Sequence, residues 1–251
     1  MEKFGIVIQC RLNSKRFPKK ILRPIMRKKS ILEFLINRLI KVFPSKKIII
    51  ASADNDSKII NISKKNNINF FVGSEKNVLK RYFDAANEYK LDYIIRITSD
   101  CPLIDPKTIK DMIKEFKKHN LDYIANTLPP KDSLWPDGSD VEIMTMKCLT
   151  RVYREATKKE DKEHVTNFIW KNKKKFKTKV FKINKDYSNF KFSVDYKDDL
   201  EVVKKILKIL KIKDQFGTIK QICSILMKNN DLKLIMKKNK SKFLNNRKDL
   251  N

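Results

Sequence analysis

A short apolar run that ends abruptly in a cationic loop constrains the fold of this chain more than any other feature. The run Phe4–Ile8 fits a buried parallel strand, because such strands read as continuous hydrophobic segments. Open α/β sheets bind their ligands beyond the carboxyl ends of the strands. The cations and the hydroxyl group that follow this strand are Arg11, Ser14, Lys15, Arg16, Lys19 and Lys20. Their chemistry predicts a polyphosphate site at its end.

A solvated basic loop is the alternative interpretation of this segment, because lysine is abundant throughout the chain. Two of the 10 arginines of the chain, Arg11 and Arg16, nevertheless fall within six residues directly after a buried strand. This position favours a functional loop.

Apolar runs and amphipathic segments alternate regularly through the first half of the chain. The predicted strands are Phe4–Gln9, Lys47–Ser52, Asn69–Val72, Asp92–Thr98 and Asp122–Asn126. The predicted helices are Ser30–Phe43, Ser57–Asn66, Asn77–Tyr89 and Pro106–His119. Ser30 and Asp105 stand at N-cap positions, the latter with Pro106 at the first helical position. The alternation is typical of βαβ units, so we expect an α/β fold with a mainly parallel sheet.

The rhythm changes after Asn126, where a Pro-rich loop leads into a region of mixed order. The strands expected there are Asp140–Met144, Lys177–Ile183 and Lys191–Val194. The helices expected there are Thr145–Thr157, Glu163–Asn172 and Lys197–Leu210. We expect a single domain over residues 1–227, with halves 1–126 and 127–227, and a Lys- and Asn-rich tail over 228–251 with at most one weak helix.

The net charge of +29 raises the question of nucleic-acid binding. The excess comes from 48 Lys against 10 Arg, and the lysines are spread along the whole chain. Nucleic-acid grooves favour arginine and a clustered patch or motif, and the sequence contains neither. Abundant Lys, Asn and Ile are typical of an AT-rich genome, so we expect no specific nucleic-acid partner.

The sequence also argues against membrane, secreted and zinc-binding proteins. Its apolar runs are shorter than the roughly 18 residues of a membrane span. The N-terminus begins a strand at once without a signal-peptide pattern, so we expect a cytoplasmic protein with no membrane partner. The four cysteines are scattered, with no C-x-x-C pair and no histidine at metal-ligand spacing.

Two aspartates at the ends of apolar runs are candidate Mg²⁺ ligands. Asp100 follows the strand that ends at Thr98, and Asp195 closes the run Phe190–Val194. Mg²⁺ takes one or two carboxylates together with substrate phosphates. Each aspartate has a structural alternative, because Asp100 could stabilise a turn and Asp195 could cap the helix that begins at Lys197.

Two later patches carry an unusual density of polar side chains. Asp140 and Glu142 are two residues apart, which places them on one face of a strand. His164, in the segment E-H-V-T, is one of two histidines in the chain, and a core or helix-surface role is its alternative. His119, near a helix end, is assigned to structure.

With these residues, the chain resembles the cytidylyltransferase-like family of spore-coat polysaccharide biosynthesis proteins, relatives of the 3-deoxy-manno-octulosonate and acylneuraminate cytidylyltransferases. The likeness spans nearly the whole chain. The segments that match family motifs, in the expected order, are Gln9–Lys20, Gly73–Tyr82, Arg96–Asp105, Pro136–Glu142, Glu163–Thr166 and Val194–Asp195. Motifs in this order are far more specific than any one of them alone.

The resemblance implies a nucleotide-diphospho-sugar transferase fold, which is a Rossmann-like, GT-A-type three-layer sandwich with a mainly parallel mixed sheet. It implies transfer of CMP from CTP to an acidic sugar or related anion, with Mg²⁺ as cofactor and release of pyrophosphate. The half 1–126 would then bind the nucleotide and the half 127–227 the acceptor.

The resemblance also implies roles for individual residues. Asp100 and Asp195 would hold the metal, and Arg11, Arg16 and Lys20 would neutralise the leaving pyrophosphate. The residues that would bind the nucleotide are Gln9, Arg11, Ser14, Lys20, Gly73, Ser74, Arg81 and Asp100. The residues that would face the acceptor are Asp140, Glu142 and His164.

The chain departs from the family pattern at three positions. Lys19 and Ser99 replace family glycines, and Asn13 replaces a frequent glycine. Loss of glycine restricts positive φ and close approach of the backbone to a phosphate.

Two other hypotheses stay open beside the cytidylyltransferase. A glycosyltransferase of the same fold would take a sugar from a nucleotide donor. Binding a nucleotide-sugar requires fewer cations around the phosphates than binding a triphosphate with a leaving pyrophosphate. A nonenzymatic basic protein would lack activity and bind polyanions in a strongly salt-dependent way. Dimerisation through the later half is also an expectation.

Overall fold

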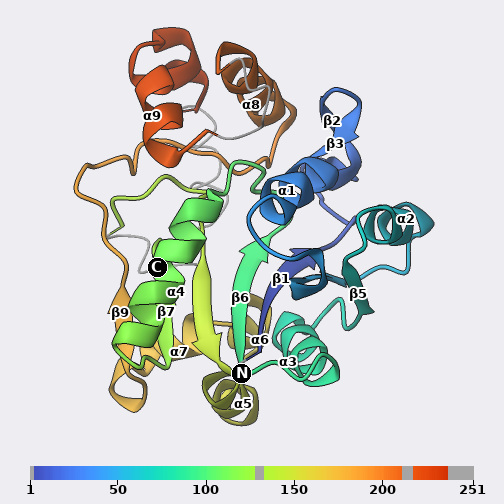
Figure 1. Ribbon diagram of the computed structural model, residues 1–251, viewed down its shortest axis with the longest axis vertical. Helices are drawn as coiled ribbons and strands as arrows, with labels where there is room; N and C mark the ends of the chain where they lie inside the picture. The colour runs from blue at the N-terminus through green and yellow to red at the C-terminus, as the bar shows by residue number, and fades with distance from the viewer. Residues whose placement is uncertain (1–2, 128–132, 211–216, 237–251) are drawn as a thin grey trace.

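A computed structural model describes residues 3–127, 133–210 and 217–236, and within these a seven-stranded sheet forms the centre of the molecule (Figure 1). Its strands are β1 (Phe4–Cys10), β4 (Ile48–Ser52), β5 (Asn69–Val72), β6 (Tyr93–Thr98), β7 (Tyr123–Ala125), β8 (Glu142–Thr145) and β9 (Thr178–Val180). Their order across the sheet is β5-β4-β1-β6-β8-β7-β9. The first strand therefore lies inside the sheet, as its apolar run predicts.

The sheet is mainly parallel, with one strand reversed. β1 pairs in parallel with β4 on one side and with β6 on the other, and β4 pairs in parallel with β5. β8 runs antiparallel between β6 and β7, while β7 and β9 are parallel. The expected α/β fold with a mainly parallel mixed sheet is confirmed.

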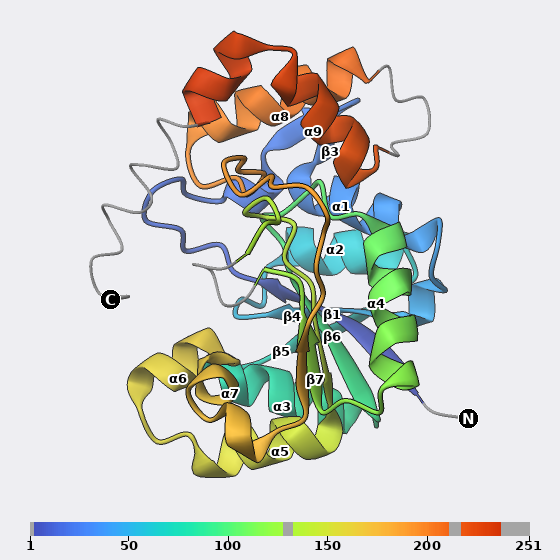
Figure 2. The same ribbon diagram turned by 90° about the vertical axis from the view of Figure 1, so that its left-hand side faces the viewer.

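Helices cover both faces of the sheet, so the molecule has three layers (Figure 2). Those on one face, whose apolar side chains pack with Ile6, Ile8 and Ile95, are α1 (Ile31–Ile40), α2 (Ser57–Lys65) and α4 (Pro106–Lys118). Those on the other face, packed with Val7 and Ile94, are α3 (Val78–Glu88), α5 (Met146–Glu155) and α7 (Asn167–Lys171), and α6 (Lys159–His164) lies against α3 and α7.

A third apolar cluster lies beyond the carboxyl ends of the central strands, at the top of Figure 1. It brings α8 (Lys197–Ile209) and α9 (Ile219–Met227) against the first turn of α1 and the small hairpin of β2 (Pro24–Met26) and β3 (Lys29–Ser30). Residues 230–236 are helical and bury Leu232 and Met236 in the same cluster. The last described segment therefore contributes to the core.

Side-chain caps begin the helices where the sequence predicts them. The Ser30 hydroxyl accepts from the Glu33 amide (3.2 Å), and the Glu33 carboxylate accepts from the Ser30 amide (2.9 Å), which forms a capping box. Asp105 caps α4 by accepting from the Lys107 amide (2.9 Å), ahead of Pro106 at the first turn. Both predicted caps are confirmed.

The structure differs from the sequence prediction in four places. Residues Lys191–Val194 form no strand, and Lys191 makes only an isolated bridge to Asp137. The helix predicted over Glu163–Asn172 is divided into α6 and α7, because Val165 between them has φ 55 and interrupts the helical backbone. The hairpin β2–β3 and helix α9 are additional elements. Part of the predicted Pro-rich loop, residues 128–132, lies outside the described residues.

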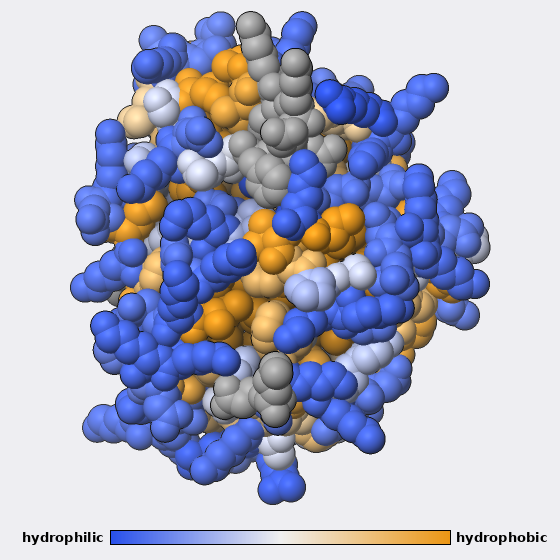
Figure 3. All heavy atoms as spheres, viewed as in Figure 1, coloured by the Kyte–Doolittle hydropathy of each residue, from blue (hydrophilic) through white to orange (hydrophobic). Residues whose placement is uncertain are grey.

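Hydrophilic side chains extend around the whole of the face in Figure 3, with apolar areas near its centre and upper edge. This distribution agrees with lysines that are spread along the sequence rather than clustered. No helix in the described part of the chain has both the length and the apolar character needed to cross a membrane.

Gly138 joins the loop before β8 to the segment before α8, and its conformation leaves no room for a side chain. Its φ is +82, and a Cβ atom there would stand 2.1 Å from the backbone nitrogen of Ser193. Only glycine meets both requirements. The contact holds residues 137 and 193 together.

We therefore expect Gly138→Ala to lower the free energy of unfolding by at least about 1 kcal/mol, because the backbone must move and φ becomes strained. Gly217→Ala is the matched control, since a Cβ there would meet only side-chain atoms of Leu210 and Ile222. Thermal unfolding followed by circular dichroism measures the difference. Equal melting temperatures for the two variants would contradict the close packing described here.

Candidate active site

The loop after β1 is held against its own backbone and against the end of β4. The Leu12 carbonyl accepts from the amides of Ser14 (2.9 Å) and Lys19 (3.1 Å), and the Leu12 amide donates to the Asp54 carboxylate (2.8 Å). Lys19 has φ 53, in the left-handed region that glycine favours, which explains why the family pattern has glycine there. After this turn the chain directs Lys20 inward, and Lys20 is only 8% exposed.

Two aspartates from distant parts of the chain meet at the Lys20 ammonium group. Lys20 Nζ lies 2.6 Å from Asp100 Oδ2 and 3.2 Å from Asp195 Oδ1. Asp100 follows the carboxyl end of β6, and Asp195 precedes α8. The structure thus brings together the opening loop and the two aspartates that the sequence predicts as metal ligands.

Asp195 receives two further cations. Arg16 Nη2 lies 2.7 Å from Asp195 Oδ1, and Lys191 Nζ lies 3.2 Å from Asp195 Oδ2. The Lys191 side chain is fully buried, and it also donates to Asp199 Oδ2 (2.8 Å) and to the Ser193 carbonyl (2.7 Å). Both oxygens of Asp195 are therefore matched by positive charge.

Lys191 and Asp199 belong to this charged cluster, and the sequence analysis did not single them out. The signal for Lys191 was a lysine inside the otherwise apolar run Phe190–Val194, which is unusual in a chain whose lysines are mostly exposed. The structural alternative for Asp195, a cap on α8, is not observed among the described residues. Tyr196 holds the N-cap of α8, and Asp199 accepts from the amides of Asp195 and Tyr196 (both 2.9 Å).

The paired charges shift the ionisation of the whole cluster. Burial alone would lower the pKa of Lys20, but attraction to Asp100 and Asp195 outweighs burial and raises it. Burial would raise the pKa of Asp195, but Lys20, Lys191 and Arg16 hold it well below its usual value. The pKa of Asp100 is also lowered, because Lys20 outweighs the effect of burial. Both carboxylates are ionised at neutral pH.

Asp100 and Asp195 fit a site for Mg²⁺, because their carboxylates converge on a common cation. Oxygen donors are what Mg²⁺ prefers, and one or two protein carboxylates are its usual complement beside substrate phosphates. In the described residues no group of three or more His, Cys, Asp or Glu side chains could hold a metal ion. Substrate phosphates and water are the usual further ligands of Mg²⁺ beside two carboxylates.

The predicted nucleotide residues Gly73, Ser74 and Arg81 form one contact group beside the ends of β4 and β5. The Gly73 amide donates to the Ser52 carbonyl (2.9 Å), and a Cβ on Gly73 would stand 2.8 Å from Arg81 Cγ. Arg81 is fully buried and donates from Nη1 to the Ser74 carbonyl (2.6 Å). Its Nε and Nη2 have no hydrogen-bond partner among the described residues. Unpaired buried donors of this kind are costly, so they mark a group that a ligand could satisfy.

Glu142 lies in the interior, away from the predicted acceptor surface. Its residue is 1% exposed, and its carboxylate forms an ion pair with Arg96 and accepts from the hydroxyls of Tyr123 (2.5 Å) and Thr166 (2.6 Å). Arg96 also donates to the Gln9 side chain (3.2 Å). Because Arg96 and Glu142 are opposite each other across β6 and β8, this buried pair anchors the strands rather than lining a surface.

The other two residues predicted to face the acceptor are Asp140 and His164. Asp140 is linked to the Lys20 cluster, because Gly138, which donates to it, packs on Ser193, and the Ser193 hydroxyl donates to Asp137 (3.0 Å) and Asp195 (3.3 Å). Asp140 accepts from the Thr127 hydroxyl (2.5 Å) and the Gly138 amide (2.8 Å), and burial and the neighbouring Asp137 raise its pKa to about 6. His164 is partly buried at the end of α6, where its carbonyl accepts from the Thr166 amide (2.5 Å). Thr166 in turn donates to the Glu142 carboxylate, so His164 is linked to Glu142 through Thr166.

The remaining predicted residues lie on the loop itself. Arg11 is exposed and forms no ion pair with any residue that the structure describes, so its guanidinium is available to a ligand. Ser14 is partly buried on the same loop.

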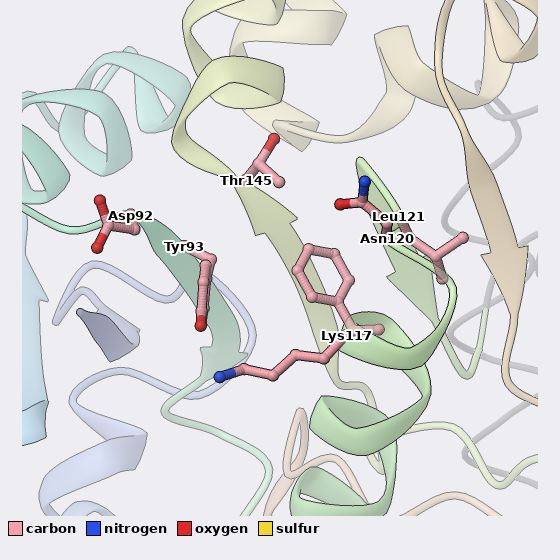
Figure 4. Close-up of a pocket in the computed structure, with 7 residues that line it drawn as sticks. Asp92, Tyr93, Lys117, Asn120, Leu121 and Thr145 are labelled. Atoms are coloured by element: carbon pink, nitrogen blue, oxygen red, sulfur yellow. The ribbon is translucent and has the colours of Figure 1, made fainter. Parts of the chain in front are cut away.

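A cavity of about 550 Å³ lies at the opposite end of β6 from Asp100 (Figure 4). Its lining includes Asp92, Tyr93, Asn120 and Thr145, and Lys117 Nζ lies 5.3 Å from the centre of the Tyr93 ring. None of the predicted site residues lines it. The candidate site is the charged cluster at the carboxyl ends of β1 and β6.

Curated proteins resemble this chain over most of its length. It is 34% identical over 173 residues to an uncharacterized protein of Methanocaldococcus jannaschii, which covers 68% of each chain. It is 28% identical over 209 residues to the spore coat polysaccharide biosynthesis protein SpsF of Bacillus subtilis, which covers 79% of this chain and 83% of SpsF.

Solved structures show the same fold. A cytidylyltransferase from Leptospira borgpetersenii superposes with a TM-score of 0.86 at 29% identity, covering 92% of this chain and 97% of that one. A CMP-2-keto-3-deoxy-manno-octonic acid synthetase complexed with CTP gives a TM-score of 0.65 at 13% identity over 83% of this chain and 100% of that one, and shares the fold alone. These neighbours have the nucleotide-diphospho-sugar transferase fold.

A family model described as cytidylyltransferase matches residues 5–248. The match includes the opening loop and both aspartates of the Lys20 cluster. This chain belongs to the cytidylyltransferase family.

Proposed function

We propose that the protein transfers CMP from CTP to an anionic, sugar-like acceptor and releases pyrophosphate, as a step in surface polysaccharide biosynthesis. The observation that carries this proposal is the meeting of Arg16 and Lys20 with Asp100 and Asp195 at the carboxyl ends of β1 and β6. Family membership and the similarity to SpsF support it.

The chemistry is an in-line displacement at the α-phosphorus of CTP. An acceptor oxygen forms the new bond to phosphorus, and the bond to the oxygen that bridges to the β-phosphate breaks. Its electron pair leaves with pyrophosphate, and any acceptor hydroxyl proton passes to solvent. Arg11, Arg16 and Lys20 supply positive charge to the leaving group, so they stabilise the transition state more than the ground state.

Asp100 and Asp195 would hold Mg²⁺, which supplies further charge neutralisation to the phosphate oxygens when bound. Lys191 and Asp199 would keep Asp195 oriented, because both are buried, pair with each other and contact Asp195. Gln9, Ser14, Gly73, Ser74 and Arg81 would contact the nucleotide.

The acceptor would approach from the half 127–227, where Asp140 and His164 lie. Burial and the neighbouring Asp137 raise the pKa of Asp140 above its usual value, and its carboxylate would accept hydrogen bonds from an acceptor. Glu142 would act only by holding β6 and β8 in register.

Sugar transfer from a nucleotide-sugar is the competing reaction on this fold. It requires charge at a diphosphate rather than at a triphosphate, and the loop of residues 11–20 carries more cations than that reaction needs. The cationic loop therefore favours nucleotidyl transfer.

The first test is pyrophosphate release with CTP, UTP, GTP and ATP, each against a panel of sugar acids and phosphorylated acceptors. We expect release with CTP and at least one anionic acceptor, and none when the acceptor is omitted. Release of a nucleoside diphosphate from a nucleotide-sugar would support the competing reaction. A folded protein that yields pyrophosphate with no pair would refute the proposal.

The second test removes one carboxylate charge at a time. We expect Asp100→Asn and Asp195→Asn each to lower kcat by roughly 100-fold or more, because each removes an interaction with the triphosphate and its metal. Asp111→Asn, on the exposed face of α4, is the matched control and retains full activity. Melting temperatures separate loss of chemistry from loss of folding. Full activity of either site variant would show that the metal lies elsewhere.

A further inference from the structure

The two carboxylates assigned to the metal already share a protein cation. Lys20 Nζ contacts Asp100 Oδ2 and Asp195 Oδ1, which are the oxygens that a metal between the two aspartates would use. The Lys20 side chain is 10% exposed, so little water competes for these contacts. A divalent cation cannot reach both aspartates while the ammonium group lies between them.

We propose that Lys20 is a placeholder for the divalent cation: it bridges Asp100 and Asp195 in the nucleotide-free protein and moves to the triphosphate when the metal enters. The proposal rests on the proposed function for the identity of the triphosphate. It adds that Lys20 makes metal binding depend on nucleotide binding.

The contacts of the two lysines in the cluster show which of them a divalent cation could replace. Lys191 is fully buried and bound to Asp199 and to the Ser193 carbonyl as well as to Asp195, so it stays in place. Among the described residues Lys20 is paired with Asp100 and Asp195 alone. Lys20 also stands at the end of the exposed loop that would receive the phosphates. It is the cation that can leave.

The charges explain why the metal and the nucleotide would bind together. If Lys20 left with nothing to replace it, two carboxylates would face each other in a poorly hydrated site, which is unfavourable. A metal alone would have to displace Lys20 without offering it another anion. A triphosphate offers that anion, and the metal compensates the carboxylates, so each favours the binding of the other.

Arg16 provides a matched comparison. It contacts the same Asp195 Oδ1 at 2.7 Å but does not bridge to Asp100, and its side chain is 36% exposed over the Tyr196 ring. Removing Arg16 takes the same charge from the site as removing Lys20. It leaves the bridge between the two aspartates in place.

The test is Mn²⁺ binding to the nucleotide-free protein, measured by electron paramagnetic resonance of free Mn²⁺. We expect Lys20→Met to bind Mn²⁺ at least about 10-fold more tightly than the unmodified protein, because the cation that competes with Mn²⁺ for the two carboxylates is removed. Arg16→Gln is expected to gain clearly less. Lys19→Met removes the charge of the exposed neighbour of Lys20, and we expect it to leave the affinity for Mn²⁺ unchanged.

Two further variants keep the result decisive. Asp100→Asn in the Lys20→Met background should abolish the gain, which locates the bound Mn²⁺. Lys20→Gln repeats the measurement if Lys20→Met melts at a much lower temperature. Unchanged Mn²⁺ affinity in both Lys20 variants, or an equal gain in Arg16→Gln, would overturn the placeholder role. Because no nucleotide is present, this outcome is independent of whether CTP is the substrate.

Discussion

The structure depends on the neutralisation of one buried carboxylate, that of Asp195. Ionised groups are expensive to remove from water unless opposite charges and hydrogen bonds surround them. Here Arg16, Lys20 and Lys191 meet that need, and Asp199 in turn fixes Lys191. The cluster ties the loop after β1 to the segment before α8. Removing one partner of such a buried cluster is strongly destabilising, because it leaves an uncompensated charge.

A second buried network gives the site a firm base. The Arg96–Glu142 pair spans β6 and the reversed strand β8, and Tyr123 and Thr166 complete the bonding of its carboxylate. Since Asp100 follows β6, anything that holds this strand also fixes where Asp100 lies. Arg38 acts from the opposite side, with Nε donating to the Ile104 carbonyl (3.0 Å) in the loop that follows Asp100. The position of the Asp100 carboxylate is thus supported by polar contacts on both faces of the sheet.

The sequence predicted local features well and long-range ones only through motifs. The βαβ alternation and the caps at Ser30 and Asp105 depend on neighbouring residues, so pattern and propensity suffice. The interior position of Glu142 could not be read in this way, because it depends on partners 19 to 46 residues away. The run before Asp195 is apolar like a strand, yet among the described residues its only bridge is the isolated one from Lys191 to Asp137. The positive φ of Val165, a branched residue, has no signal in the sequence.

The separation of Lys20 from Asp195, 175 residues along the chain, has a consequence for synthesis on the ribosome. The parallel strands β5, β4, β1 and β6 are all present once about 100 residues have emerged, and domains begin to fold as their elements become available. Lys20 can then pair with Asp100 long before its second partner has been translated. The nascent protein would hold the parallel part of the sheet with one of the two ion pairs of Lys20 formed, and the charge cluster would be completed only after Asp195 is translated.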